Sequence, residues 1–98
     1  MDATLSISDI EKLVAERAEQ IDRAFNPNQV HVYEDPHPTD GSALVVQISA
    51  NRPEDREVWT RLRLRLSQAI RDALLERGDD RYPLIEVFGP EEWAGRND

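Results

Sequence analysis

The feature that most constrains the fold is a long helical pattern in the second half of the chain. Its apolar residues recur at three- and four-residue steps and therefore share one helix face: Val58, Trp59, Leu62, Leu66, Ala69, Ile70, Ala73 and Leu74. A helix-start signal at Asn51 and a stop at Gly78 predict a helix that runs to about Glu76. Such a helix is about 35 Å long, and other elements must cover its apolar face.

A second, shorter stripe lies near the start of the chain. It consists of Ile7, Ile10, Val14, Ala18, Ile21 and Phe25. The stripe predicts a helix from about Ser6 to Ala24, and Pro27 is expected to stop it because proline disfavours helical angles in the preceding residue.

Three shorter runs are typical of β-strands, at residues 30–34, 43–50 and 84–88, since their β-branched and aromatic residues alternate between two faces. The first two runs should form a hairpin. The third follows the long helix and should lie parallel to the second, as in a βαβ unit. We therefore predict one small α+β domain over residues 1–98, in the order α-β-β-α-β with a short C-terminal helical turn. Its three-stranded mixed sheet should carry both helices on one face.

Composition narrows the classes of function. The formal charge of −8 repels nucleic acid and anionic lipid, and the chain has no cysteine for a thiolate nucleophile or an iron–sulfur site of its own. No apolar run approaches the roughly 18 residues of a membrane span, and the acidic start does not look like a signal peptide, so a cytoplasmic protein is expected. Neither a nucleophile elbow nor a glycine-rich phosphate loop is present, which favours a non-enzymatic protein without a cofactor or metal.

Titratable residues offer few candidates for chemistry. His31 is expected to be an exposed strand residue, whereas His37 lies between two prolines on a loop and presents an exposed ring. Acidic residues lie three or four positions from each histidine, but no helix is predicted there that would bring them onto one face, so a structural role is favoured for both. We interpret the adjacent acids at 34–35 and 79–80 as solvated charges at turns.

The long predicted helix is locally rich in arginine. Arg61 and Arg65 flank one side of its apolar face, and Arg56 and Arg63 flank the other. Split flanks are typical of long side chains that lie over a core edge. The alternative is a nucleic-acid footprint that uses Arg61 and Arg65 with Arg71.

Leu64 and Leu75 project from the polar side of the same predicted helix, about three turns apart. They could cover an edge of the core, contact a partner, or meet their own copies across a homodimer axis. The leading prediction is a protein-interaction or regulatory adaptor that presents the loop at 35–41 and the exposed side of this helix. Its partner-binding residues would be His37, Arg61, Leu64, Arg65 and Leu75.

Several stretches together resemble the BolA-like family, whose domain is a variant of the type II KH architecture. They are the strand-loop-strand at 30–49, the arginine- and leucine-rich helix after it, and the closing Pro90-Glu91-Glu92-Trp93. The resemblance covers about Ile10 to Trp93 and implies a regulatory adaptor that acts with monothiol glutaredoxins, with His37 at the place of a loop cluster ligand. The family's second histidine ligand is missing from residues 82–88, and the Gly-x-x-Gly loop of nucleic-acid-binding KH domains is absent.

Overall fold

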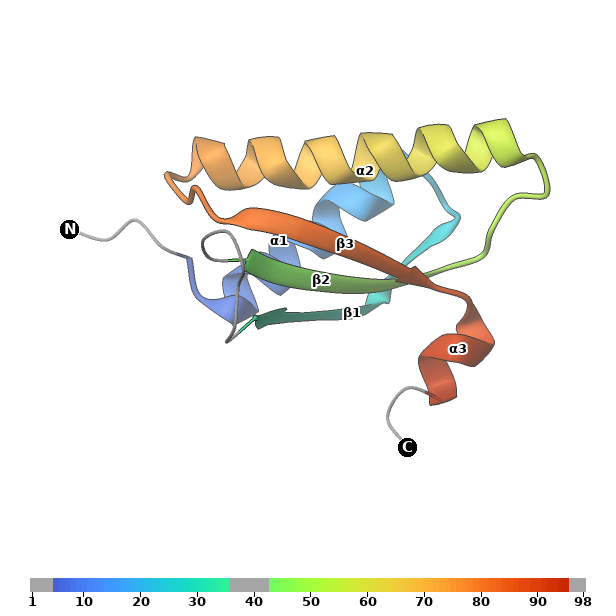
Figure 1. The fold of residues 1–98 in the computed structure, drawn as a ribbon, viewed down its shortest axis with the longest axis horizontal. Helices are drawn as coiled ribbons and strands as arrows, with labels where there is room; N and C mark the ends of the chain where they lie inside the picture. The colour runs from blue at the N-terminus through green and yellow to red at the C-terminus, as the bar shows by residue number, and fades with distance from the viewer. Residues whose placement is uncertain (1–4, 36–42, 96–98) are drawn as a thin grey trace.

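The computed structural model of the chain describes residues 5–35 and 43–95. Its elements are α1 (Ile7–Ile21), β1 (Phe25–Glu34), β2 (Ala43–Ala50), α2 (Arg56–Glu76), β3 (Tyr82–Phe88) and α3 (Pro90–Gly95). The strands form one sheet in the order β1-β2-β3, with β1 antiparallel and β3 parallel to β2 (Figure 1). The predicted α+β fold with a three-stranded mixed sheet and a short C-terminal helix is confirmed.

The core lies between one face of the sheet and the two long helices. Leu44, Val46 and Ile48 point from β2 into this layer and are fully buried there. They are covered by the apolar stripes of α1 and α2, which the helical spacing had predicted. In Figure 1, α1 crosses behind the sheet and α2 runs along the side of β3. The short α3 lies at the far end of the sheet.

The start of α2 differs from the prediction. The helix begins at Arg56, and its N-cap is Asp55 rather than Asn51. The Asp55 carboxylate accepts hydrogen bonds from the backbone amides of Glu57 and Val58 at 2.8 and 3.3 Å. Aspartate and asparagine are about equally good N-cap residues, so the sequence alone did not distinguish Asn51 from Asp55. In the structure the cap is Asp55, which directly precedes the helix.

The first strand is longer than predicted. It begins at Phe25 rather than Val30, and α1 correspondingly ends at Ile21. Pro27 is tolerated because β1 is an edge strand and its register shifts between Asn26 and Val30. Phe25 is buried, as its place in the apolar stripe suggested, but it reaches the core from a strand.

A buried ion pair closes the end of the sheet where α2 turns into β3. The Arg81 Nε and Nη2 atoms donate to the two oxygens of Asp79 at 3.0 and 2.7 Å. The same carboxylate accepts from the Leu5 amide at 3.1 Å, and Arg81 also donates to the Leu5 carbonyl and to the Glu34 carboxylate. We call these four residues the clamp. Asp79 is 2% exposed, so its interpretation as a solvated charge was wrong.

Two leucines on α2 test the assignment of the core. Leu66 is fully buried and Leu64 is 65% exposed, although they lie only two positions apart. We expect Leu66→Ala to lower the free energy of unfolding by about 3 kcal/mol, because it removes buried methyl groups and leaves a cavity. The matched change Leu64→Ala should alter it by less than about 0.5 kcal/mol. Urea denaturation of both variants measures the difference, and equal losses would contradict the assignment.

The clamp predicts an acid-dependent stability. Hydrogen bonds from the Arg81 side chain lower the pKa of Asp79 from 3.8 to about 2. The stabilisation from ionised Asp79 is therefore complete above about pH 5 and is lost as the pH falls towards 2. We expect Asp79→Asn to cost about 3 kcal/mol at pH 7, because it leaves Arg81 without its buried counter-charge. The variant should also lose less stability than the wild type between about pH 5 and pH 2 in urea titrations. Parallel pH profiles would contradict this role.

Candidate binding groove

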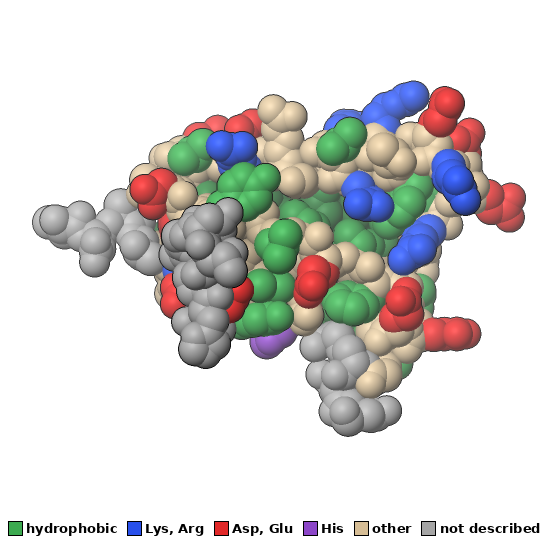
Figure 2. Space-filling model, in the orientation of Figure 1, with side chains coloured by type: hydrophobic (Ala, Val, Ile, Leu, Met, Phe, Trp, Pro, Cys, Tyr) green, Lys and Arg blue, Asp and Glu red, His purple; other side chains and the backbone are tan. Residues whose placement is uncertain are grey.

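A hollow of about 280 Å³ separates α2 from β3. Its lining from the helix consists of Thr60, Arg63, Leu64 and Ser67, and its lining from the strand consists of residues 82–85 and Val87. We call this hollow the helix–strand groove. Figure 2 shows hydrophobic side chains gathered between the line of α2 and the strand below it, with basic side chains nearby.

Neighbouring hollows extend the groove in both directions along α2. One of about 190 Å³ shares Arg63 and Ile85 with it and reaches Trp59. Another of about 540 Å³ shares Leu64 and Tyr82 and reaches Leu75. The surface beside β3 is therefore an elongated channel rather than an isolated pocket, which suits an extended ligand.

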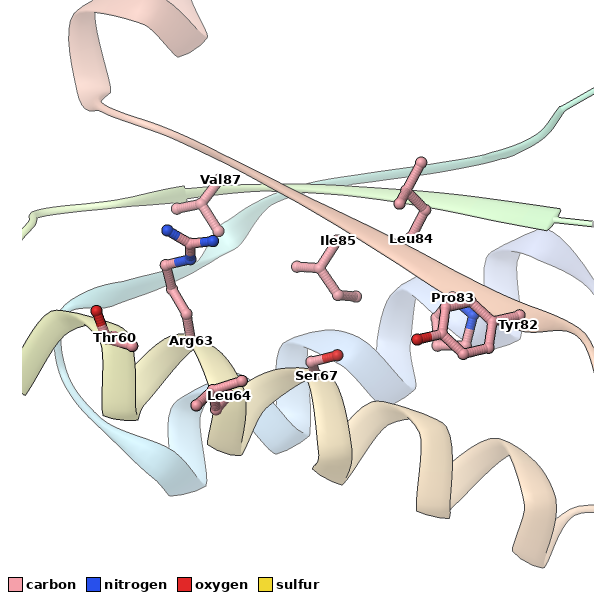
Figure 3. A pocket seen from close by; sticks show the side chains of 9 residues that line it. All are labelled: Thr60, Arg63, Leu64, Ser67, Tyr82, Pro83, Leu84, Ile85 and Val87. Carbon is pink, nitrogen blue, oxygen red and sulfur yellow. The ribbon is translucent and has the colours of Figure 1, made fainter.

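The groove exists because α2 directs its buried stripe towards α1 and the centre of the sheet. Leu62, Leu66 and Ile70 are buried in that core. The neighbouring helix residues that face β3 therefore pack against the strand only loosely. On the strand side, Ile85 points towards α2 and Leu84 points away from it (Figure 3). Figure 3 also shows Arg63 extending from the helix towards Val87.

The two outer strands of the sheet, β1 and β3, differ in what contacts their outer edges. On β1, the backbone amide of Val32 donates to the Glu11 carboxylate of α1 at 3.0 Å, so a helix side chain occupies part of that edge. On β3, one side pairs with β2, and no strand within residues 5–35 and 43–95 pairs with the other. An unpaired strand edge is a template for pairing with another chain.

The rim of the groove carries two arginines although the protein is acidic, and one acid, Asp72, lines the same neighbouring hollow as Arg71. Arg63 lines the groove itself, and the Arg71 guanidinium lies 5.2 Å from the centre of the Tyr82 ring. Neither arginine forms an ion pair with another described residue. Two cationic side chains beside an apolar floor can hold a ligand that carries both apolar and acidic groups.

The residues singled out from the sequence are only partly brought together. Leu64 and Leu75 are 65% and 52% exposed, as predicted, and both border the channel. Arg61 instead lines a shallow hollow on the outer surface of α2, and Arg65 is exposed but borders none of these hollows. His37 lies outside the described residues.

Sequence reasoning missed Tyr82 and Leu84 as site residues. Both are about half exposed, and Leu84 was read correctly as lying on the sheet face opposite Ile85. A leucine on a short strand was the available signal, but it could not show that this strand lies at an edge. Arg63 was noticed as a helix flank without its position beside β3.

The open face of the sheet is a weaker candidate. His31 lies beside Tyr33 with ring centres 5.7 Å apart, and the Gln47 amide donates to Glu86 at 3.0 Å. At one end of the sheet the Trp93 ring of α3 packs edge-on against Phe88. Across the described part of the chain, no group of three or more His, Cys, Asp or Glu side chains could hold a metal ion.

Comparisons with protein-family models, with curated proteins and with solved structures found no match. The resemblance to the BolA-like family therefore stays a prediction. In the part of the chain that the structure describes, no helix has the length and apolar character needed to span a bilayer.

Proposed function

We propose that this chain is a non-enzymatic interaction module that binds a protein partner in the helix–strand groove. The observation that carries the proposal is the gathering of exposed apolar side chains around a free strand edge. Leu64 and Leu75 approach that edge from α2, and Tyr82 approaches it from β3. Scattered exposed leucines are ordinary, whereas an apolar group beside an unpaired strand is typical of a binding surface.

The size of the groove favours a weak, exchangeable partner. Full burial of a leucine contributes about 2 kcal/mol, and the leucines along this channel are already partly buried. Their combined contribution is therefore several kcal/mol, before the entropy lost on association is subtracted. Affinities in the micromolar range or weaker suit an adaptor that exchanges partners.

The chemistry of the acidic residues also supports a binding role. Asp79 is a buried carboxylate with a shifted pKa, which in an enzyme would suggest an acid or base. Here both of its oxygens accept hydrogen bonds from Arg81, and its pKa is lowered rather than raised towards neutrality. The perturbed group therefore acts in the clamp, away from the groove. The BolA-like resemblance adds the expectation of a regulatory partner.

Site-specific crosslinking tests the location of the site. We expect a photoreactive benzoylphenylalanine at Leu64 to form an adduct with one defined protein from the native host, and the same probe at His31 on the open sheet face to form none. With that protein purified, Leu64→Glu should weaken binding at least tenfold, because it removes about 2 kcal/mol of apolar burial. Isothermal calorimetry measures the change. Equal adducts from both positions, or unchanged affinity of the variant, would contradict the proposal.

A second candidate function is nucleic-acid binding through the arginines of α2. It is favoured by one observation, namely that none of these arginines forms an ion pair with another described residue: Arg56, Arg61, Arg63, Arg65 and Arg71. They are divided between the two flanks of the helix, however, and the whole chain carries a charge of −8.

Salt dependence separates the two functions. Because phosphate contacts release counterions, a nucleic-acid footprint would give an affinity that falls steeply with salt. We expect no binding of generic single-stranded RNA or DNA at about 150 mM salt by fluorescence anisotropy. Specific binding at that ionic strength, lost in an Arg61→Glu and Arg65→Glu double variant, would favour the alternative.

A further inference from the structure

We infer that the segment bound in the helix–strand groove is an extended strand of a partner protein, which pairs with the free edge of β3 and carries carboxylates towards Arg63 and Arg71. This inference rests on the proposed function and specifies the chemistry of its partner. It follows from three independent properties of the groove, namely the strand edge, the apolar floor and the charge of the rim.

The strand edge determines the conformation of the bound segment. β3 is seven residues long and offers its outer backbone groups to no other described strand. Pro83 has no amide hydrogen, so the donors for pairing lie in the rest of the strand. An extended peptide that lies between a helix and a strand can continue the sheet and satisfy these groups through its own backbone. A helical segment would leave them unpaired.

The floor of the groove determines the spacing of apolar residues in the segment. Ile85 and Val87 point to the helix side of the sheet, two positions apart, and Leu64 closes the groove from α2. In an added strand, every second side chain points to that same side. The segment should therefore place its apolar residues at alternate, helix-facing positions over about seven residues, which is the length of β3, and any carboxylate that meets α2 must occupy one of these same positions.

The charge of the rim determines which helix-facing positions of the segment carry acids, because Arg63 and Arg71 lie on the helix side of the sheet together with Ile85 and Val87. Arg63 and Arg71 have no ionic partner among the described residues, and a carboxylate can accept two hydrogen bonds from one guanidinium. A second copy of this chain is a poorer occupant, because its own β3 carries a single carboxylate and pairing of two β3 edges would bring the arginines of both rims together. The observations thus favour an acidic segment from a different protein over a homodimer.

Peptide display provides the test. The full-length chain is immobilised and exposed to a library of random heptapeptides, with the Arg63→Glu variant as a parallel target. We expect enrichment, on the wild-type chain alone, of peptides in which valine, isoleucine or leucine and at least one aspartate or glutamate share the same set of alternate positions. Enrichment of basic peptides, the same sequences on both targets, or no enrichment on the wild-type chain would overturn the inference.

A charge-matched variant distinguishes a direct contact between the peptide and Arg63 from an effect of the protein's net charge. Arg65→Glu changes the net charge by the same amount as Arg63→Glu but lies on the opposite flank of α2. For a synthetic peptide from the enriched set, we expect at least a tenfold loss of affinity with Arg63→Glu and less than a twofold change with Arg65→Glu. Similar losses in both variants would show that binding follows net charge, and would overturn the inference.

Backbone methylation tests strand pairing. Methylating one peptide amide removes a hydrogen-bond donor without changing charge, and scanning this change along the peptide should weaken binding at least tenfold at alternate positions. Amide chemical shifts should move in β3 and not at His31 on the open sheet face. Uniform effects along the peptide, or shifts on the open face, would overturn strand addition.

The outcomes distinguish this inference from the function on which it rests. If benzoylphenylalanine at Leu64 captures a defined partner while no acidic extended peptide binds, the adaptor function stands and the strand-addition inference fails. If sedimentation of the purified chain shows a dimer that Leu64→Glu dissociates, the groove belongs to a second copy and both proposals fail. For each variant, the far-UV circular dichroism spectrum and the melting temperature are compared with those of the wild type, as a control that the fold is retained.

Discussion

Burial of β2 between two strands and beneath two helices is the constraint on which the rest of the structure depends. Because β2 pairs along both of its edges, the sheet must end at β1 on one side and at β3 on the other. Leu44, Val46 and Ile48 provide the apolar surface that both helices cover. Once α1 is placed over β1, it also supplies Glu11 to that outer edge. No other described strand pairs with the outer edge of β3, and the candidate site lies along it.

The clamp complements this layered core with polar contacts. A single buried carboxylate, Asp79, joins the residue before α1 to the start of β3, and Arg81 extends the network to the end of β1. These segments are far apart in the sequence, so their contacts hold together the end of the sheet where α2 turns into β3. As in other buried ion pairs, the attraction between the two charges offsets the free-energy cost of removing each from water. None of the four clamp residues lines the hollows beside β3.

The accuracy of the sequence-based prediction varied with the kind of signal. Gly78 was identified as the end of α2, and it has the positive φ of 79° that only glycine adopts without strain. The start of α2 was misplaced because Asn51 and Asp55 are both good caps. Phe25 fitted the helical stripe and is buried, yet it lies in β1. An apolar residue that is predicted to be buried can belong to either a helix or a strand, so the stripe alone did not assign its element. Leu64 was found as an exposed leucine, whereas Tyr82 was not recognised as its neighbour.

Local periodicity was sufficient for the order of the elements and for most core residues, because a buried face repeats at a regular spacing along the chain. It placed Val58 on the buried face, although that residue is 39% exposed, and it missed the buried Leu13. The strand pairing followed from the usual connections of hairpins and βαβ units. Local periodicity was not sufficient for Asp79, which reads as one of two adjacent surface acids until Arg81 and Leu5 are brought to it. Nor did it reveal the helix–strand groove, since Arg63 and Ile85 lie more than 20 positions apart and no short-range pattern links them. Those features depend on which strand lies at an edge and on how far a helix stands from it. Only the packing of the whole chain decides these distances.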